Sequence, residues 1–337
     1  MRRVFRNRAF GAAIVVLSLL LAACGGGDDE GSGEGATETT GSEATETTGA
    51  TETTMTDTTS GESMTDGPTI TVASFNFPES VILAEIYAQA LEAQGYPVER
   101  NLNLGSRELI FPEIEAGNID LLPEYLSSSL QVGFAADAPT SVDEGISALS
   151  TAFADMGMVV LEPAPGEDKN VFVVTQGFSD ENGVTSLTDL SGVDSATLAG
   201  PPECEERETC FAGLVDTYGL STLAFESIQE GAARVAALDA GDIDVALLFS
   251  TQPVITEMGF VALEDPEGLI APENIVPVVS QEAADAYGDD LTTLMNDISG
   301  QITTDVLLDL NGRVELDAQS PDEVATAWLT ETGYIGG

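Results

Sequence analysis

The feature that most constrains the fold is a nine-residue pattern that occurs twice. Residues 114–122 read IEAGNIDLL and residues 238–246 read LDAGDIDVA. Each copy ends a helical pattern at a glycine, where a left-handed backbone is needed, and continues at once into an apolar strand. We expect two lobes of related construction, although two ordinary helix-to-strand turns that look alike by chance would give the same pattern.

From Thr69 onward, short apolar runs alternate with helical patterns, which indicates parallel sheets with crossover helices. Expected strands cover residues 70–74, 98–104, 158–161 and 171–175, and expected helices cover 81–90, 106–115 and 142–156. Asn76 with Glu79, and Ser320 with Glu323, have the spacing of a capping box at a helix start. The second pair precedes a helix that contains Trp328.

The chain after Gly67 is long enough for two lobes of about 100 to 150 residues each. Residues 274–279 are predicted to form a strand that returns to the first lobe. Lobe I would then comprise 68–168 and 275–337, and lobe II 169–274. Two crossovers allow the lobes to close around a ligand. Ligands of such sheets sit beyond the carboxyl ends of strands, so residues 74–76, 123–125 and 249–251 are expected to face a cleft.

Residues 1–23 have the pattern of an export signal. Four arginines within the first eight residues precede an apolar run, 9–20, that is too short to span a bilayer comfortably. The run ends in LAAC, small residues before a cysteine, which is the pattern that lipoprotein signal peptidase cleaves. We expect a mature chain that begins at a lipidated Cys24 on the outer face of the cell membrane. An ordinary secretory signal that happens to contain a cysteine is the alternative.

Residues 24–67 are predicted to form a disordered tether. They contain no aromatic residue, lysine or arginine, and TETT or TDTT recurs at 37–40, 45–48, 51–54 and 56–59. Such a segment cannot bury enough apolar surface to offset the entropy of ordering it. Glycosylated threonines in a stalk would fit the same repeats.

The charge is strongly negative, with 58 Asp and Glu against 10 Lys and Arg. This balance argues against nucleic acid and anionic membrane surfaces as partners, because phosphate contacts need clustered basic residues. Long-range steering would favour cationic ligands, and a surface kept soluble in salty or acidic surroundings is an equal explanation.

The sequence contains no histidine, which excludes Ser-His-Asp and Cys-His nucleophilic sites and histidine-ligated zinc. Carboxylate pairs such as Asp242 with Asp244, or Asp120 with Glu124, could act as in a glycosidase. Pairs of this kind arise by chance among 58 carboxylates, and neighbouring strand residues face alternate sides. We expect no enzymatic activity, metal or cofactor.

Cys204 and Cys210 are the only thiols after Cys24. They are expected to form a local disulfide in an oxidising compartment, with free thiols as the alternative. Their spacing is not that of the redox motif C-x-x-C.

Several stretches resemble the glycine betaine, choline and proline betaine class of binding proteins for ABC importers. These stretches are 70–79, 104–108, 117–125, 200–203, 206–207, 218–220 and 240–251, and in order they cover essentially all of 68–337. The resemblance implies an α/β, two-lobed periplasmic-binding-protein fold of type II with the ligand in the cleft between the lobes. It also implies capture of a quaternary-ammonium compatible solute for an ABC permease and its ATPase subunit.

Members of this class hold the trimethylammonium head of their ligand in a cage of tyrosines, and its carboxylate with basic and hydroxyl groups. A methylated cation cannot donate a hydrogen bond and is best met by aromatic faces. The resemblance makes Tyr125 a cage residue and Arg207 a carboxylate partner. Phe249 stands where a second tyrosine is usual, Val235 at a third aromatic position, and Phe75 in place of a lysine. These departures leave choline-like or otherwise altered ligands open.

The expected ligand contacts are Ser74, Phe75, Asn76, Tyr125, Asn170, Arg207, Phe249, Ser250 and Thr251. Structural roles compete with several of them. Tyr125 and Phe249 end buried strands and would fit a core, Asn76 would fit a helix cap, and Arg207 between two glutamates would fit a surface ion pair. Ser250 and Thr251 would also fit a turn. At the level of function, a lipoprotein of the same fold for a different solute, or a solute sensor, is the alternative.

Overall fold

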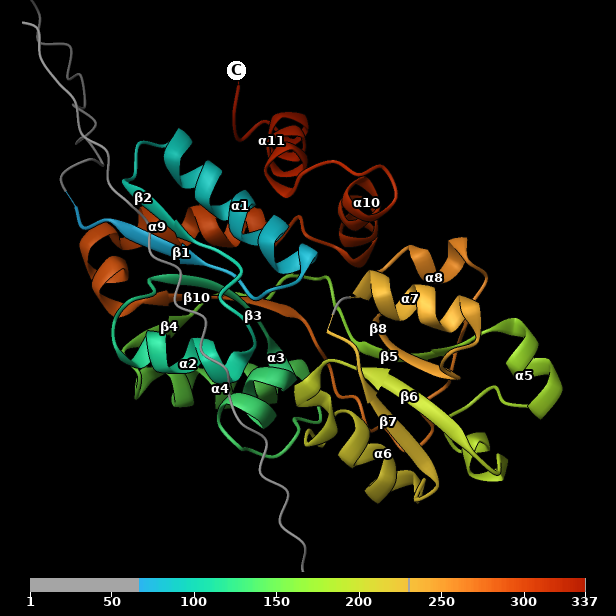
Figure 1. Cartoon of the computed structure of the whole chain (residues 1–337). Helices are drawn as coiled ribbons and strands as arrows, with labels where there is room; N and C mark the ends of the chain where they lie inside the picture. Colours follow the sequence, from blue (N-terminus) through green and yellow to red (C-terminus); the bar gives the residue numbers. More distant parts are fainter. Residues whose placement is uncertain (1–66, 230, 337) are drawn as a thin grey trace, which may run out of the picture. The chain divides into compact units, whose positions relative to one another are not determined.

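The two copies of the repeated pattern form the same turn in two different β-sheets (Figure 1). The computed structural model describes residues 67–229 and 231–336. In the first copy, helix α2 ends before Gly117 and strand β3 follows; in the second, helix α7 ends before Gly241 and strand β8 follows. Gly117 and Gly241 have φ angles of 72° and 75°, the left-handed region that glycine adopts most readily. The predicted helix-to-strand turn is therefore present in both lobes, with one copy in each sheet.

The aspartates of the repeat also have equivalent structural roles. Asp120 exchanges two hydrogen bonds with Thr71, one through its carboxylate and one through its backbone, both 2.9 Å long. Asp244 does the same with Thr197, at 2.8 and 3.1 Å. Each aspartate thus fixes the start of its strand to the neighbouring parallel strand. This accounts for both carboxylates without a catalytic role.

The first sheet has the strand order β2-β1-β3-β10-β4. Its lobe contains β1 (Ile70–Ala73), α1 (Pro78–Ala93), β2 (Val98–Asn101), α2 (Arg107–Glu115), β3 (Leu121–Tyr125), α3 (Leu126–Ser128), α4 (Val142–Ala154), β4 (Met158–Val160), β10 (Ile275–Ser280), α9 (Gln281–Ser299), α10 (Thr304–Glu315) and α11 (Pro321–Thr332). Strands β1, β2 and β3 are parallel, whereas β10 runs antiparallel to β3 and β4. The prediction of a parallel sheet was wrong for β10, because this strand returns from the other lobe without a crossover helix.

The second sheet has the order β7-β6-β8-β5-β9 and is mixed for the same reason. Its lobe contains β5 (Asn170–Val174), α5 (Gln176–Asn182), β6 (Ala196–Gly200), α6 (Phe211–Tyr218), β7 (Leu223–Ser227), α7 (Gly231–Ala240), β8 (Val245–Phe249), α8 (Val254–Glu257) and β9 (Val261–Ala262). Strand β5, which enters from the first lobe, is antiparallel to β8 and β9. Strands β6, β7 and β8 are parallel.

Both faces of the second sheet are buried. Val245 and Leu247 of β8 pack in one apolar cluster, whereas Ala246 and Leu248 pack in another. Because successive strand residues point to opposite faces, each cluster covers one side of the sheet. This explains why β8 is a continuous apolar run rather than an alternating one.

The two crossovers between the lobes lie side by side. Glu167 pairs with Asn274 in an isolated antiparallel bridge, and the Asp168 N–H donates to the Glu273 carbonyl at 3.0 Å. This arrangement supports our proposal that the lobes divide at 168/169 and 274/275. The expected export signal and, apart from Gly67, the expected tether lie outside the described residues.

The two expected capping boxes differ in outcome. At α11, Ser320 and Glu323 form the box as predicted. At α1 the prediction was wrong, because Phe77 is the N-cap residue and no side chain caps the helix. Pro78 at the first position needs no N–H partner, and the Glu79 carboxyl makes tertiary contacts instead.

Candidate functional site

A cavity of about 90 Å³ is lined by residues of both lobes and of the crossovers. One bound water needs a cavity of about 10 to 15 Å³, so this cavity suits a small solute or several waters. Six of the nine expected contacts line it, namely Phe75, Asn76, Tyr125, Asn170, Arg207 and Phe249. The structure thus brings together residues that are up to 174 positions apart in the sequence.

Three expected contacts lie elsewhere. Ser74 is buried, and its hydroxyl accepts from the Asn103 N–H at 2.9 Å, so it fixes a loop. The Ser250 hydroxyl accepts from the Lys169 N–H at 2.8 Å and holds a crossover. Thr251 lines a second, adjacent cavity rather than the first. Val235, which stands at an aromatic position of the resembled class, packs against an apolar cluster of the second lobe.

Four aromatic rings meet in the first cavity. The Phe77 ring lies at the centre of the group, with its centroid 5.9 Å from Phe75, 5.7 Å from Tyr125 and 5.3 Å from Phe249. Phe75 and Tyr125 are 6.3 Å apart. Phe249 belongs to the second lobe and the other three rings to the first, so the cluster joins the lobes. Sequence reasoning missed Phe77, although it lies within one of the stretches that carried the resemblance.

The guanidinium group of Arg107 lies against the ring of Phe75. The Arg107 guanidinium carbon lies 4.9 Å from the centroid of the Phe75 ring, within cation–π distance. Arg107 is buried and forms two hydrogen bonds, of 2.9 and 2.6 Å, with the fully buried carboxylate of Glu124. Although burial alone would lower the pKa of Arg107, Glu124 raises it above its ordinary value. Arg107 therefore remains a cation that is neutralised inside the protein.

The carboxyl group of Glu79 lies directly behind the aromatic cluster. Glu79 is 5% exposed and accepts hydrogen bonds from the Tyr125 hydroxyl at 2.9 Å, from Thr251 at 2.6 Å and from the Asn311 amide at 2.7 Å. Tyr125 and Asn311 belong to the first lobe and Thr251 to the second. A single side chain therefore orients a ring of the cavity and holds the lobes together.

Asp168 lies next to Glu79 and shares its environment. Burial raises the pKa of Glu79, and hydrogen bonds from Thr251, Asn311 and Tyr125 oppose this shift. Burial and then the charge of Glu79 raise the pKa of Asp168 well above its ordinary value. Two buried carboxyl groups this close do not both ionise readily, so Asp168 retains a proton more readily than an ordinary carboxyl group.

Glu273, in the second crossover, also lines the cavity. Its carboxylate accepts from the backbone N–H groups of Ser127 and Ser128, at 3.0 and 2.8 Å, and from the Ser128 hydroxyl. Burial raises its pKa to about 7, against the effect of these donors and of Arg107. No sequence pattern marked Glu273, because its partners are about 145 residues away.

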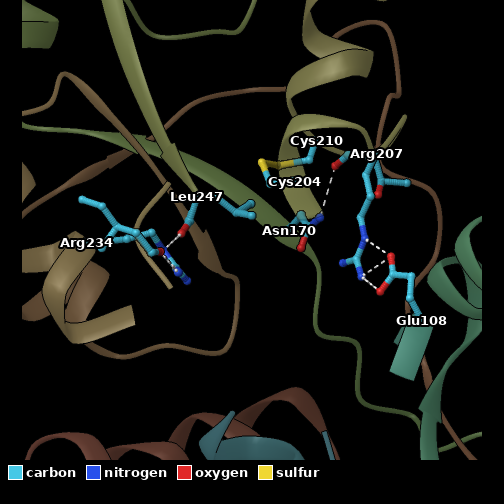
Figure 2. The surroundings of a disulfide bond; sticks show 9 residues. Glu108, Asn170, Cys204, Arg207, Cys210, Arg234 and Leu247 are labelled. Carbon is cyan, nitrogen blue, oxygen red and sulfur yellow. Dashed lines mark hydrogen bonds and ion pairs between the residues drawn. A yellow bond between two sulfur atoms is a disulfide. The ribbon is translucent and has the colours of Figure 1, made fainter. Parts of the chain in front are cut away.

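Arg207, which lines the cavity from the second lobe, contacts Glu108 of the first lobe (Figure 2). Its Nε donates to Glu108 at 3.2 Å, and its Nη2 contacts both carboxylate oxygens at 3.0 and 2.9 Å. The loop that carries Arg207 is closed by the expected Cys204–Cys210 disulfide. Asn170 donates to the Thr209 carbonyl in the same loop at 3.1 Å. Arg207 thus lines the cavity, as expected for a ligand contact, and also forms an ion pair, as the competing structural role predicted. Its partner in the ion pair belongs to the other lobe.

Within residues 67–229 and 231–336, no helix is both long and apolar enough to cross a membrane. Over the same residues, His, Cys, Asp and Glu side chains form no group of three or more that could hold a metal ion. The described lining of the first cavity presents aromatic rings, carboxyl groups and two guanidinium groups.

Curated relatives are similar in sequence over most of their length. The glycine betaine-binding protein YehZ of Escherichia coli is 24% identical over 271 residues, which cover 76% of this chain and 88% of that protein. The glycine-betaine-binding protein of Pseudomonas aeruginosa is 25% identical over 274 residues, 78% of this chain and 88% of that protein.

Solved structures agree on the fold. A glycine betaine/carnitine/choline ABC transporter structure matches with a TM-score of 0.64 at 19% identity, over 80% of this chain and 99% of that one. A choline binding protein in complex with choline matches with a TM-score of 0.60 at 14% identity, over 79% and 89%. Residues 68–331 match the OpuAC family, described as the substrate binding domain of ABC-type glycine betaine transport systems. The chain, a two-lobed α/β binding protein, belongs to this family.

Proposed function

We propose that the first cavity captures the quaternary ammonium group of a small compatible solute, with the rings of Tyr125, Phe77 and Phe249 as its walls. As a family member, the protein is the substrate-binding component of an ABC importer for quaternary amine osmoprotectants and not an enzyme. The observation that carries the proposal is the meeting of aromatic rings from both lobes around one small cavity. Methylated cations are attracted to such rings and cannot satisfy hydrogen-bond acceptors.

The same arrangement supports a mechanism of closure. Because Tyr125 and Phe249 come from different lobes, a cation between them contacts both only when the lobes are together. A ligand shifts the equilibrium toward the closed state only by as much as it binds that state better than the open state. The acceptor Glu79 supports the closed geometry independently, since it joins Thr251 to the first lobe.

Calorimetry tests this proposal. Tyr125→Ala and Phe249→Ala should each weaken choline or glycine betaine binding on the order of tenfold, because a desolvated cation–π contact is worth roughly 1 to 2 kcal/mol. Tyr334→Ala is the matched control, since it removes a ring of the first lobe that does not line the cavity. Unchanged affinity in both cavity variants would place the ligand elsewhere. No binding of either ligand by the parent protein would favour a different solute or a sensor.

We also propose that the protein acts outside the cell membrane, tethered through a lipid on Cys24, and delivers its ligand to a separate permease with its ATPase subunit. The LAAC sequence before the tether supports this anchor. The acidic composition supports a cationic ligand in addition, because the summed negative charge raises the local concentration of cations.

A further inference from the structure

The Glu108 carboxylate forms an ion pair with the guanidinium group of Arg207, the residue that the resemblance implies for binding a ligand carboxylate. Three contacts of 2.9 to 3.2 Å join its carboxylate to the Nε and Nη2 atoms of Arg207 (Figure 2). This is the forked geometry in which an arginine binds carboxylates best. We propose that Glu108 determines which class of ligand binds, an inference that rests on the proposed function. The cavity then prefers quaternary ammonium alcohols such as choline to zwitterions such as glycine betaine.

The charges around the cavity support this preference. The described lining includes two guanidinium groups, and each is matched by a carboxylate that does not itself line the cavity: Arg207 by Glu108 and Arg107 by Glu124. The lining also includes the carboxyl groups of Asp168, Glu203 and Glu273. Even if protons neutralise some of these carboxyl groups, the walls carry no net positive charge.

A zwitterion and a choline-like cation meet these walls differently. A ligand carboxylate that enters the cavity loses its hydration and finds both arginines engaged, which is costly for an anion. An alcohol brings no negative charge, and its hydroxyl can donate to a lining carboxyl group. Choline therefore complements the walls in both charge and hydrogen bonding.

Arg234 lines the adjacent second cavity and is another guanidinium group that a ligand carboxylate could approach. Its Nε donates to the Leu247 carbonyl at 2.9 Å, and its Nη1 donates to the carbonyls of Ile228 and Gln229 at 2.9 and 2.8 Å. The same cavity is lined by the carboxyl groups of Glu79 and Glu315. With Asp168 and Glu203, which also line this cavity, a ligand carboxylate directed there would approach four acidic groups along with this arginine.

The competing possibility is that a ligand carboxylate displaces Glu108. The Glu108 side chain is 47% exposed, so water would solvate it after displacement. Exposed ion pairs are weak, so the discrimination due to Glu108 should be modest, about fivefold in the ratio of dissociation constants. The ratio of the dissociation constants for choline and glycine betaine is the appropriate measurement, because loss of a contact between the lobes affects closure around both ligands equally.

The experiment measures binding of choline and of glycine betaine by calorimetry to the whole mature chain. The wild type should bind choline more tightly, and Glu108→Gln should shift the ratio of the two dissociation constants about fivefold toward glycine betaine. Glu115→Gln is the matched control, because it removes the same charge from an exposed position of the same helix. In an Arg207→Gln background, Glu108→Gln should leave the ratio unchanged.

The outcomes separate the two proposals. If choline binds but glycine betaine binds as tightly, or if Glu108→Gln leaves the ratio unchanged, the role of Glu108 is rejected while the ammonium site stands. An equal loss for both ligands would make the ion pair a closure contact alone and would also reject it. If neither ligand binds the wild type, the proposed function fails and the inference fails with it.

Discussion

The Thr251 hydroxyl in the second lobe donates a 2.6 Å hydrogen bond to Glu79 in the first turn of α1 in the first lobe. The two residues are 172 positions apart, and both are buried. Through its other acceptor positions Glu79 also holds Tyr125 and Asn311. The orientation of a cavity ring and the contact between the lobes therefore depend on one carboxyl group.

Thr251→Val should weaken ligand binding about tenfold. The variant keeps the size of the side chain but removes the hydroxyl, and a hydrogen bond to a charged or partly charged group contributes roughly 1.5 to 3 kcal/mol. Because this bond joins the lobes, its loss should destabilise the closed state. Calorimetry with choline measures the effect, and Thr256→Val, an exposed threonine of α8, is the control. Equal affinities of the Thr251 variant and the wild type would show that the bond does not contribute to closure.

Phe77→Leu should reduce the preference of the cavity for a cation. Leucine fills part of the space but has no π face, and Phe77 contacts the rings of both Tyr125 and Phe249. The measurement compares choline with 3,3-dimethylbutan-1-ol, in which carbon replaces the ammonium nitrogen. The ratio of their affinities should fall about threefold to tenfold in the variant. A constant ratio would indicate that Phe77 contributes packing only.

Glu273 should make the stability of the protein depend on pH. Burial raises the pKa of Glu273 from the ordinary glutamate value of 4.5 to about 7, so the folded state favours the protonated form of this side chain. The resulting stabilisation is fully present below about pH 4.5 and is lost as the pH rises through about 7. Relative to Glu273→Gln, the free energy of unfolding of the wild type should fall by up to about 3 kcal/mol between pH 4.5 and pH 8.

Urea denaturation at several pH values checks this expectation. Glu282→Gln, at an exposed position in the first turn of α9, is the control for removal of one carboxyl group. A difference between the wild type and Glu273→Gln that stays constant with pH, or that rises with pH, contradicts the assignment.

Replacement of both Cys204 and Cys210 by alanine should lower the free energy of unfolding by about 2 kcal/mol, because the disulfide closes a short loop of the unfolded chain. Denaturation with and without reductant measures this. The wild type should lose about as much in reductant, whereas the double variant should not respond. Alkylation without reductant followed by intact-mass measurement should label neither cysteine of the wild type, and labelling of both would reject the disulfide.

Cys24→Ser should move the protein from the membrane fraction to the soluble or secreted fraction, because one thiol would carry the whole anchor. Cell fractionation with immunodetection measures this, and the double alanine variant at Cys204 and Cys210 is the control for loss of thiols elsewhere. A Cys24→Ser variant that stays with the membrane would contradict the lipid anchor.

The sequence alone determined the features that depend on local backbone conformation and on residue chemistry. Gly117 and Gly241 end their helices with the predicted left-handed conformation, because a residue without Cβ adopts it readily. The capping box at Ser320 and the bond between Cys204 and Cys210 also involve partners only a few residues apart. The absence of histidine excluded whole classes of catalytic site without any structure.

Only the tertiary structure decided which charged and aromatic groups meet. Strands β5 and β10 enter their sheets from the opposite lobe and run antiparallel to their neighbours, so residues far apart in sequence converge at the crossovers. Glu108 and Arg207 are 99 positions apart, and the partners of Glu273 lie about 145 positions before it. No local sequence pattern predicts these pairs. Glutamate and arginine are common on exposed surfaces, and only the fold decides which of them are buried and which oppositely charged or hydrogen-bonding partner each one meets.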